Sequence, residues 1–326
     1  MVLIKPRLEF DRLEKIGEDE VGTYACGGRM IVSAPDMEDL VVPFRSSFPE
    51  NPSAQCKVWS DLVDSFDEGD APAQWFSKFF QIPCRLMIKD TRTVRTTDPL
   101  HTPPRDFFHY EPQAAFSDGF PFLLLSTSSM DKLNSLLALE NLAPAHALNF
   151  RPNIMITGTT EPNVEDTYLR ISVNRYPFFI ACRCTRCQVP GNDLKTGKMK
   201  NDITKVIMRY RRIDPGAPYK ACFGVNAIPG GVGYVLKVGD VVSVDETGVH
   251  TRKGGVWNGT EVPVVLGGVQ DVEKKSVSIG GGVGRRRSVD ITVRNKWGNG
   301  GFGGLLGWVA LIFPGLSGIL TRWWPF

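Results

Sequence analysis

The stretch Cys182-Arg183-Cys184-Thr185-Arg186-Cys187 places three thiols within six residues, at the expected end of a β-strand. Thiolates are protein ligands that soft metals prefer, and the two arginines supply positive charge beside them. A zinc ion or an iron–sulfur cluster would need four ligands, yet the next cysteine, Cys222, lies 35 residues away without a CxxC partner. Buried strand cysteines that bind no metal remain the alternative, because unpaired cysteine is among the most buried residue types.

The composition is that of an ordinary globular protein and argues against several functional classes. Of the 326 residues, 38 are Lys or Arg and 35 are Asp or Glu, which gives a net charge of +3. So balanced a charge is unlike that of a protein that binds nucleic acid by neutralising many phosphates. Seven cysteines are too few for the disulfide framework of a small secreted domain, so a reducing compartment is predicted. The four histidines have no metal-ligand spacing.

Short strands with few helices between them are predicted along most of the chain. Alternating apolar residues predict the strands, and apolar residues at helical spacing predict the helices. The expected strands are a pair within 27–42, single strands at 84–89, 122–126 and 154–158, and a closing pair within 234–242. The expected helices begin at Asp70, after Ser128 and near Ile203. This pattern favours a barrel-like mixed fold over a doubly wound sheet.

The C-terminal part differs in composition from the rest. Residues 249–296 are rich in glycine, valine and lysine, and are predicted to be a flexible linker. Residues 297–321 contain no charged side chain, and their apolar core has nearly the length of a bilayer span. We therefore expect residues 297–326 to form a membrane anchor that leaves the rest of the chain in the cytosol. The alternative is an apolar tail packed on the body or a glycine-rich disordered end.

Several segments, taken in order, resemble one family. They are CKVWSDLVDSFDEGDAPAQWFSKFF (56–80), SDGFPFLLLSTSSMDKLN (117–134), NFRPNI (149–154), CTRCQVPGNDLKTG (184–197) and CFGVN (222–226). Each segment is weakly specific, but their order and spacing closely resemble the MOSC domain, a molybdenum-cofactor-binding module, and its N-terminal partner domain. The resemblance covers about residues 27–242 and is greatest to the branch of the amidoxime-reducing components.

This resemblance implies a mixed, β-rich fold: a MOSC β-barrel preceded by an N-terminal MOSC-type α/β domain, with the predicted C-terminal transmembrane helix added. The expected boundaries are 1–98 for the N-terminal domain, 99–248 for the MOSC domain, 249–296 for the linker and 297–326 for the anchor. Family members carry a P-[IV]-K-S-C strand motif and an Asp-Arg pair that would precede Met1, so we expect the N-terminal domain to be truncated.

The resemblance also implies a site for molybdenum-molybdopterin. Cys187 matches the protein ligand of the metal, whereas Cys184 matches a position that does not bind it. Cys187 and Asp118 are the implied catalytic residues. The implied cofactor-binding residues lie in four segments, and they are Ser117, Asp118, Gly119, Phe120, Arg151, Asn153, Thr185, Arg186 and Asn226.

By the same resemblance, the chain would be a molybdenum-dependent oxidoreductase that reduces small N-hydroxylated compounds. Electrons would come from cytochrome b5 and NADH-cytochrome b5 reductase, at the mitochondrial outer membrane or the endoplasmic reticulum. Two alternatives stay open: a non-catalytic cofactor-binding or sulfur-carrier module, and an inactive truncated isoform. Related MOSC domains form the C-terminal part of enzymes that sulfurate the cofactor, and those enzymes also contain a pyridoxal-phosphate domain. We expect no such domain before the MOSC segment here.

Overall fold

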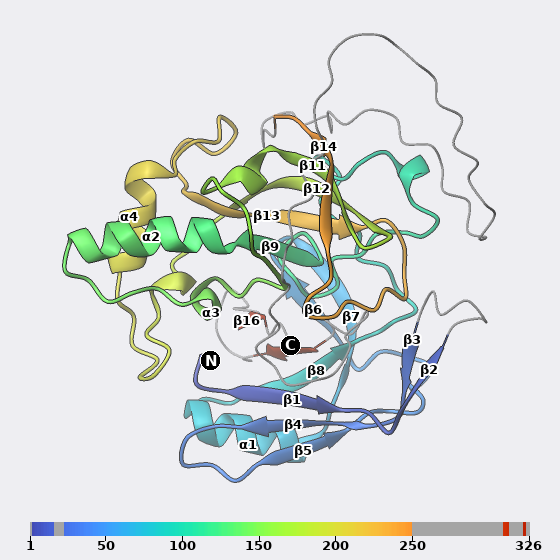
Figure 1. Ribbon diagram of the computed structural model, residues 1–326. Coiled ribbons are helices and arrows are strands. Elements are labelled where there is room, and N and C mark those ends of the chain that lie inside the picture. The colour runs from blue at the N-terminus through green and yellow to red at the C-terminus, as the bar shows by residue number, and fades with distance from the viewer. Residues whose placement is uncertain (1, 16–22, 250–308, 313–321, 324–326) are drawn as a thin grey trace.

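The computed structural model (Figure 1) describes all residues except 1, 16–22, 250–308, 313–321 and 324–326. The predicted linker, 249–296, therefore lies almost wholly outside the described residues. The described part is β-rich and consists of two neighbouring portions. One is built on small antiparallel sheets, and the other is a larger sheet with helices on one face.

The N-terminal portion contains a three-stranded sheet in the order β1-β4-β5, a hairpin of β2 and β3, and part of a five-stranded sheet in the order β16-β15-β8-β7-β6. The strands are β1 (Lys5–Glu9), β2 (Arg12–Lys15), β3 (Thr23–Cys26), β4 (Arg29–Ser33), β5 (Leu40–Pro43), β6 (Ala54–Val58), β7 (Asp61–Asp67) and β8 (Arg85–Lys89). The expected strand pair within 27–42 is confirmed as β4 and β5, which pair antiparallel.

Helix α1 (Asp70–Phe80) covers β8 and β5 as its aromatic pattern predicts. Phe76 is fully buried among Met30, Val32 and Leu86, because its position on the helix faces the sheets. The helix begins at Asp70 as predicted, with Gly69 in the cap position and Asp70 in the first turn. The negative charge of Asp70 is favourable there because it lies at the positive end of the helix dipole.

The second portion is a six-stranded sheet in the order β10-β9-β13-β12-β11-β14. Its strands are β9 (Phe122–Ser126), β10 (Ile154–Ile156), β11 (Tyr168–Val173), β12 (Tyr176–Thr185), β13 (Cys222–Pro229) and β14 (Val242–Thr247). Its helices are α2 (Thr127–Leu139), α3 (Ala147–Phe150) and α4 (Asp202–Tyr210), with short 3-10 turns η1 (Arg105–Phe107), η2 (Val164–Thr167) and η3 (Val189–Gly191).

Helices α2 and α4 lie side by side on one face of this sheet (Figure 1). Leu133 and Leu137 of α2 and Ile207 of α4 pack there with Leu125 of β9 and Phe223 of β13. The predicted helices after Ser128 and near Ile203 are thus confirmed, although the cap of α2 is Ser126, whose hydroxyl accepts from the amide of Ser129. A second core of strand side chains covers the opposite face.

Two expectations about strands are wrong. Residues 234–238 form no strand, because Tyr234 and Leu236 pack against the core outside the ladders while β14 pairs with β11 instead. The expected closed barrel is a curved, half-barrel sheet in the described residues, with β10 and β14 as its two edges. Among the described residues the sheet stays open, because β10 pairs through three residues with β9 alone and β14 pairs with β11 alone.

The predicted C-terminal transmembrane helix is also wrong. Part of the uncharged segment is described, and Val309–Ile312 form strand β15, which pairs antiparallel with β8 and with β16 (Arg322–Trp323). The remainder of 297–326 lies outside the described residues. Within the described residues, no helix is both long and apolar enough for a membrane span. A short apolar segment with β-branched residues can pair as a strand at a sheet edge or lie in a bilayer, and its composition does not distinguish the two. This explains why a transmembrane helix was predicted.

Candidate functional site

The three cysteines within residues 182–187 lie in three different environments. Cys182 is fully buried on β12, and the amide of Asn226 lies 3.4 Å from its Sγ. Cys184 is half-buried, and Nη1 of Arg186 lies 3.1 Å from its sulfur. Cys187 follows the end of β12 and is exposed. Of the three thiols, Cys187 is therefore the one that solvent or a ligand reaches.

Arg186 is fixed beside Cys187 by three contacts. Its backbone amide donates to the carbonyl of Ala221 at 2.8 Å, which keeps the chain in register just after β12 ends. Its Nη2 donates to the carbonyl of Phe150 at 2.9 Å, and its guanidinium lies 5.4 Å from the centre of the Phe150 ring. Its Nε is buried and meets no hydrogen-bond partner among the described residues. A buried donor of this kind is suited to an anionic or carbonyl ligand.

Arg151 lies close to Arg186 in space, where α3 ends. It has a left-handed conformation, φ 59° and ψ 48°, which terminates the helix before Pro152. Burial lowers the pKa of Arg151 to about 10, with a smaller contribution in the same direction from the positive charge of Arg186. The negative charges of Asp118 and Cys187 act in the opposite direction. These four side chains therefore share one electrostatic environment, in which two guanidinium groups adjoin a carboxylate and a thiol.

Asn149 ties the segments of Arg151 and Cys187 together. Its side-chain amide donates to the carbonyls of Pro190 at 3.1 Å and Asn192 at 2.9 Å, in the loop that follows Cys187. Its Oδ1 accepts from the amide of His146, in a reciprocal cap at the start of α3. The local sequence thus holds the two predicted segments at a fixed separation.

The loop that carries Asp118 is held from within and from the N-terminal portion. The hydroxyl of Ser117 donates to the carbonyl of Phe120 at 2.7 Å and also bonds Ala114, so it stabilises the loop itself. The carbonyl of Gly119 accepts from the amide of Asp98 at 3.1 Å. The carboxylate of Asp118 itself is exposed.

Two residues that the sequence analysis missed position this loop. Arg95 is buried, and it bonds the carbonyls of Ala115, Ser117 and Asp118 while its Nε donates to Asp61 at 2.8 Å. Trp59, in the turn between β6 and β7, donates from Nε1 to Oδ1 of Asp118 at 3.1 Å. Trp59 belongs to a segment that carried the family resemblance, but nothing in the linear pattern relates it to residue 118.

Other predicted site residues serve the scaffold in this structure. Phe120 packs in a core cluster with Phe108 and Phe179. Oδ1 of Asn153 accepts from the amide of Leu123 at 2.8 Å, which joins β10 to β9. Thr185 ends β12 opposite Cys222, and Asn226 lies on β13 against Cys182, as described above. Electrostatic interactions thus link Arg151 with Asp118, Arg186 and Cys187, whereas the contacts described for the remaining predicted residues are with the scaffold.

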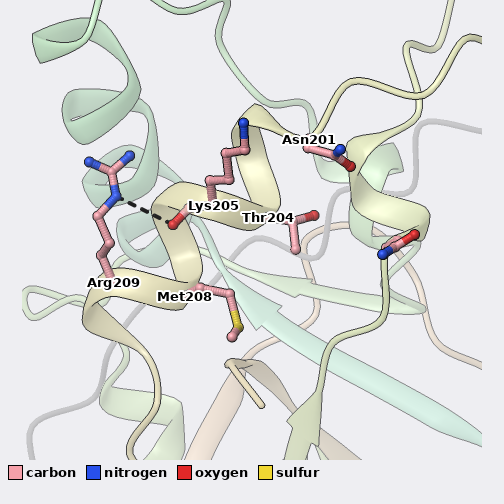
Figure 2. Close-up of a pocket in the computed structure, with 6 residues that line it drawn as sticks. Asn201, Thr204, Lys205, Met208 and Arg209 are labelled. Carbon is pink, nitrogen blue, oxygen red and sulfur yellow. Dashed lines mark hydrogen bonds between the residues drawn. The ribbon is translucent and has the colours of Figure 1, made fainter. Parts of the chain in front are cut away.

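A shallow hollow is lined in part by Gln188, the residue that follows Cys187 in the sequence (Figure 2). It has a volume of about 510 Å³ and lies along α4, and its lining consists of Gln188, Asn201, Thr204, Lys205, Met208 and Arg209. Nε of Arg209 is turned back onto the carbonyl of Lys205 at 3.4 Å. The lining is mostly polar side chains of one helix.

The described residues contain no group of three or more His, Cys, Asp or Glu side chains arranged to hold a metal ion. The zinc or iron–sulfur alternative would require such a group near Cys187. A single cysteine ligand is instead compatible with a metal whose other ligands come from a cofactor.

Comparisons with known proteins agree with the segments noted in the sequence. The family model described as the MOSC domain matches residues 111–245, and the one described as the MOSC N-terminal beta barrel domain matches residues 12–83. Mitochondrial amidoxime-reducing component 1 of Homo sapiens is 29% identical over 224 residues, which cover 66% of this chain and 63% of the human protein.

Two further relatives show the same range of similarity. Mitochondrial amidoxime-reducing component 1 of Mus musculus is 31% identical over 57% of this chain and 53% of its own length. Molybdenum cofactor sulfurase of Bos taurus is 28% identical over 60% of this chain and 22% of its own length. The chain thus spans less than two thirds of the relatives it matches. The chain therefore contains a MOSC N-terminal beta barrel domain followed by a MOSC domain.

Proposed function

We propose that this chain binds molybdenum-molybdopterin and reduces N-hydroxylated compounds, of which amidoximes are the type named in its relatives. The single observation that carries the proposal is the exposed Cys187 thiol in the same electrostatic environment as Arg151, Arg186 and Asp118. We also propose the boundaries 1–98 and 99–248 for the two folded domains.

The residues of the site fit such a cofactor. Cys187 would supply a thiolate ligand to the metal, and a thiolate is a ligand type that molybdenum accepts. Arg151 and Arg186 would hold the phosphate and the pterin, because planar guanidinium groups bind anionic oxygens through paired donors. The Nε of Arg186, which has no hydrogen-bond partner within the described part of the chain, is one donor that such a ligand would satisfy. Ser117, Gly119, Phe120, Asn153, Thr185 and Asn226 would shape the surrounding wall.

The cofactor would supply the electron pair that cleaves the N–O bond. For an amidoxime, two electrons and two protons give the amidine and water. The chain's own contribution is then to bind the substrate, orient it and move a proton. Asp118 would move this proton: Trp59 donates to its Oδ1, and Oδ2 would pass a proton to the departing hydroxyl.

Electron delivery and location are part of the same proposal. We propose cytochrome b5 and NADH-cytochrome b5 reductase as electron donors, as the family resemblance implies. The relatives are named as mitochondrial proteins, and this supports mitochondrial association of the present chain. Pyridoxal phosphate has no role in this proposal.

Replacing the three cysteines in turn tests the metal assignment. Cys187→Ala should abolish bound molybdenum and turnover of benzamidoxime, because it removes the protein's sulfur ligand. Cys184→Ser and Cys182→Ser are the matched controls and should retain molybdenum, measured by mass spectrometry of the metal and by fluorescence of the oxidised pterin. Molybdenum loss in a control variant but not in Cys187→Ala would refute the assignment.

The match to a molybdenum cofactor sulfurase favours a second candidate, a cofactor-binding or sulfur-carrier module without turnover. Both candidates predict bound molybdenum. They differ in reductase activity, because the second predicts that the metal-loaded protein leaves benzamidoxime unchanged even when cytochrome b5, its reductase and NADH are supplied.

A further inference from the structure

Trp59 occupies a position that disfavours it in two ways. It is in the two-residue turn between Val58 and Asp61, which pair as the last residues of the β6–β7 hairpin. Its φ is 53°, in the left-handed region where such turns normally have glycine or asparagine. Its side chain is 71% exposed, although an indole is a large apolar group. A strained backbone and an exposed aromatic ring at one residue indicate a functional role.

The position of Trp59 relative to the site is fixed by two separate contacts. Its Nε1 donates to Oδ1 of Asp118 at 3.1 Å. In the same turn, Asp61 accepts from Arg95, which also bonds the backbone carbonyl of Asp118 at 2.9 Å. The turn is therefore attached to the Asp118 loop through both a side chain and the backbone. The indole keeps its polar edge on Asp118 while most of its surface is open to solvent.

Asp118 connects Trp59 to the rest of the site. An N–OH group bound at the carboxylate of Asp118 would have Trp59 at its margin, because Nε1 of the indole lies 3.1 Å from Oδ1 of Asp118. The indole would then meet the part of the substrate beyond the reacting group. Aromatic rings stack on one another with favourable geometry, and an exposed indole face offers such a surface.

We propose that Trp59 is a specificity-determining residue, whose exposed indole stacks on the aromatic ring of aryl N-hydroxylated substrates. This inference rests on the proposed function, and it adds a substrate class to it: aryl amidoximes over alkyl amidoximes. The hydrogen bond to Asp118 sets the orientation of the indole, and the ring itself provides the discrimination.

Two variants separate the ring from its hydrogen bond, and a third provides the control. Trp59→Phe keeps an aromatic face and loses the donor, whereas Trp59→Ala loses both. Leu62→Ala is the matched control, because Leu62 is 63% exposed on the same hairpin and its aliphatic side chain cannot form a hydrogen bond with Asp118. The measured quantity is the ratio of kcat/KM for benzamidoxime to kcat/KM for acetamidoxime.

Trp59→Ala should lower this ratio about fivefold to tenfold, mainly through the KM of benzamidoxime. Trp59→Phe should keep most of the ratio, and Leu62→Ala should keep all of it. An unchanged ratio in Trp59→Ala would overturn the inference. If that unchanged ratio came with an equal loss of kcat/KM for both substrates, it would show that Trp59 acts only by positioning Asp118.

A binding measurement that needs no turnover separates this inference from the proposed function. Benzamidoxime, titrated into the molybdenum-loaded protein without any electron donor, should quench tryptophan fluorescence saturably in the wild type and in Leu62→Ala, and the saturable part should be absent in Trp59→Phe. Acetamidoxime should give no saturable quenching. A wild-type protein that carries molybdenum but reduces neither amidoxime would refute the proposed function, while the quenching data would still decide the role of Trp59.

Discussion

Replacing Arg95 with alanine is the most informative test of how the Asp118 loop is held. The Arg95 side chain is 8% exposed and bonds four oxygens: Asp61 at 2.8 Å, Ala115 at 3.0 Å, Ser117 at 2.5 Å and Asp118 at 2.9 Å. Three of these oxygens are backbone carbonyls of the loop that carries Asp118. The substitution removes all four bonds and leaves a space the size of a guanidinium group.

The expected loss of stability follows from these contacts. Hydrogen bonds from a charged donor contribute roughly 1.5 to 3 kcal/mol each where the acceptor stays buried. Asp61 is 48% exposed, so its ion pair adds about 1 kcal/mol at most. Water can enter the vacated space and recover part of the carbonyl bonding. We therefore expect Arg95→Ala to lower the free energy of unfolding by about 3 to 4 kcal/mol.

Two comparison variants make the experiment specific. Arg95→Lys keeps the charge but lacks the planar fork, so it should recover about half of the loss. Arg105→Ala removes an exposed arginine, with an 82% exposed side chain, that pairs with Glu111, and should cost about 1 kcal/mol or less. Urea unfolding midpoints give the three values, provided that the slope stays constant. A loss for Arg95→Ala no larger than that for Arg105→Ala would refute the argument.

Two further predictions concern the scaffold of the six-stranded sheet. Gly224→Ala should lower the melting temperature more than Gly69→Ala. Both glycines have a positive φ (76° and 93°), but a Cβ at Gly224 would lie 2.8 Å from the carbonyl oxygen of Leu124, whereas a Cβ at Gly69 would have no atom within 4 Å. Equal shifts of the melting temperature would contradict this prediction. Burial raises the pKa of Glu165 above its usual 4.5, so the contribution of Glu165 to stability is complete below about pH 4.5 and is lost as the pH rises through the folded-state pKa. Glu165→Gln should therefore gain stability relative to the wild type as the pH rises through this range. Parallel curves of stability against pH for the two proteins would contradict this prediction.

Local patterns predicted much of the fold because they report directly on burial. The apolar alternation that predicted β4 and β5 and the aromatic spacing that predicted α1 both correspond to side chains in one core. The patterns failed where a segment of the sequence is compatible with more than one strand partner or environment. Residues 234–238 have the alternation of a strand, yet the sheet edge at β11 pairs with β14. Val309–Ile312 lie in an uncharged run that suits a bilayer, yet they pair with β8.

The candidate site was predictable where its residues are close in sequence. The spacing of the cysteines singled out residues 182–187, and the resemblance to the MOSC domain distinguished Cys187 within them. Cys187 is exposed and Cys182 is buried, while the role of Cys187 as a metal ligand stays a prediction. Arg95 and Trp59 could not be found in this way, because they reach the Asp118 loop across the fold. A buried arginine that bonds carbonyls has no linear pattern at all.

The position of Asp118 depends on the N-terminal portion more than on the sheet that follows it. Phe116, two residues earlier, is fully buried in a cluster with Cys56, Val58, Val63 and Met87 of β6, β7 and β8. Arg95 and Trp59 add polar contacts from the same side. Cys187, in contrast, is held by the end of β12 and by the link from Asn149 to the following loop. The carboxylate and the thiol are thus fixed by different parts of the chain, so a change that shifts one part against the other alters their separation without altering either residue.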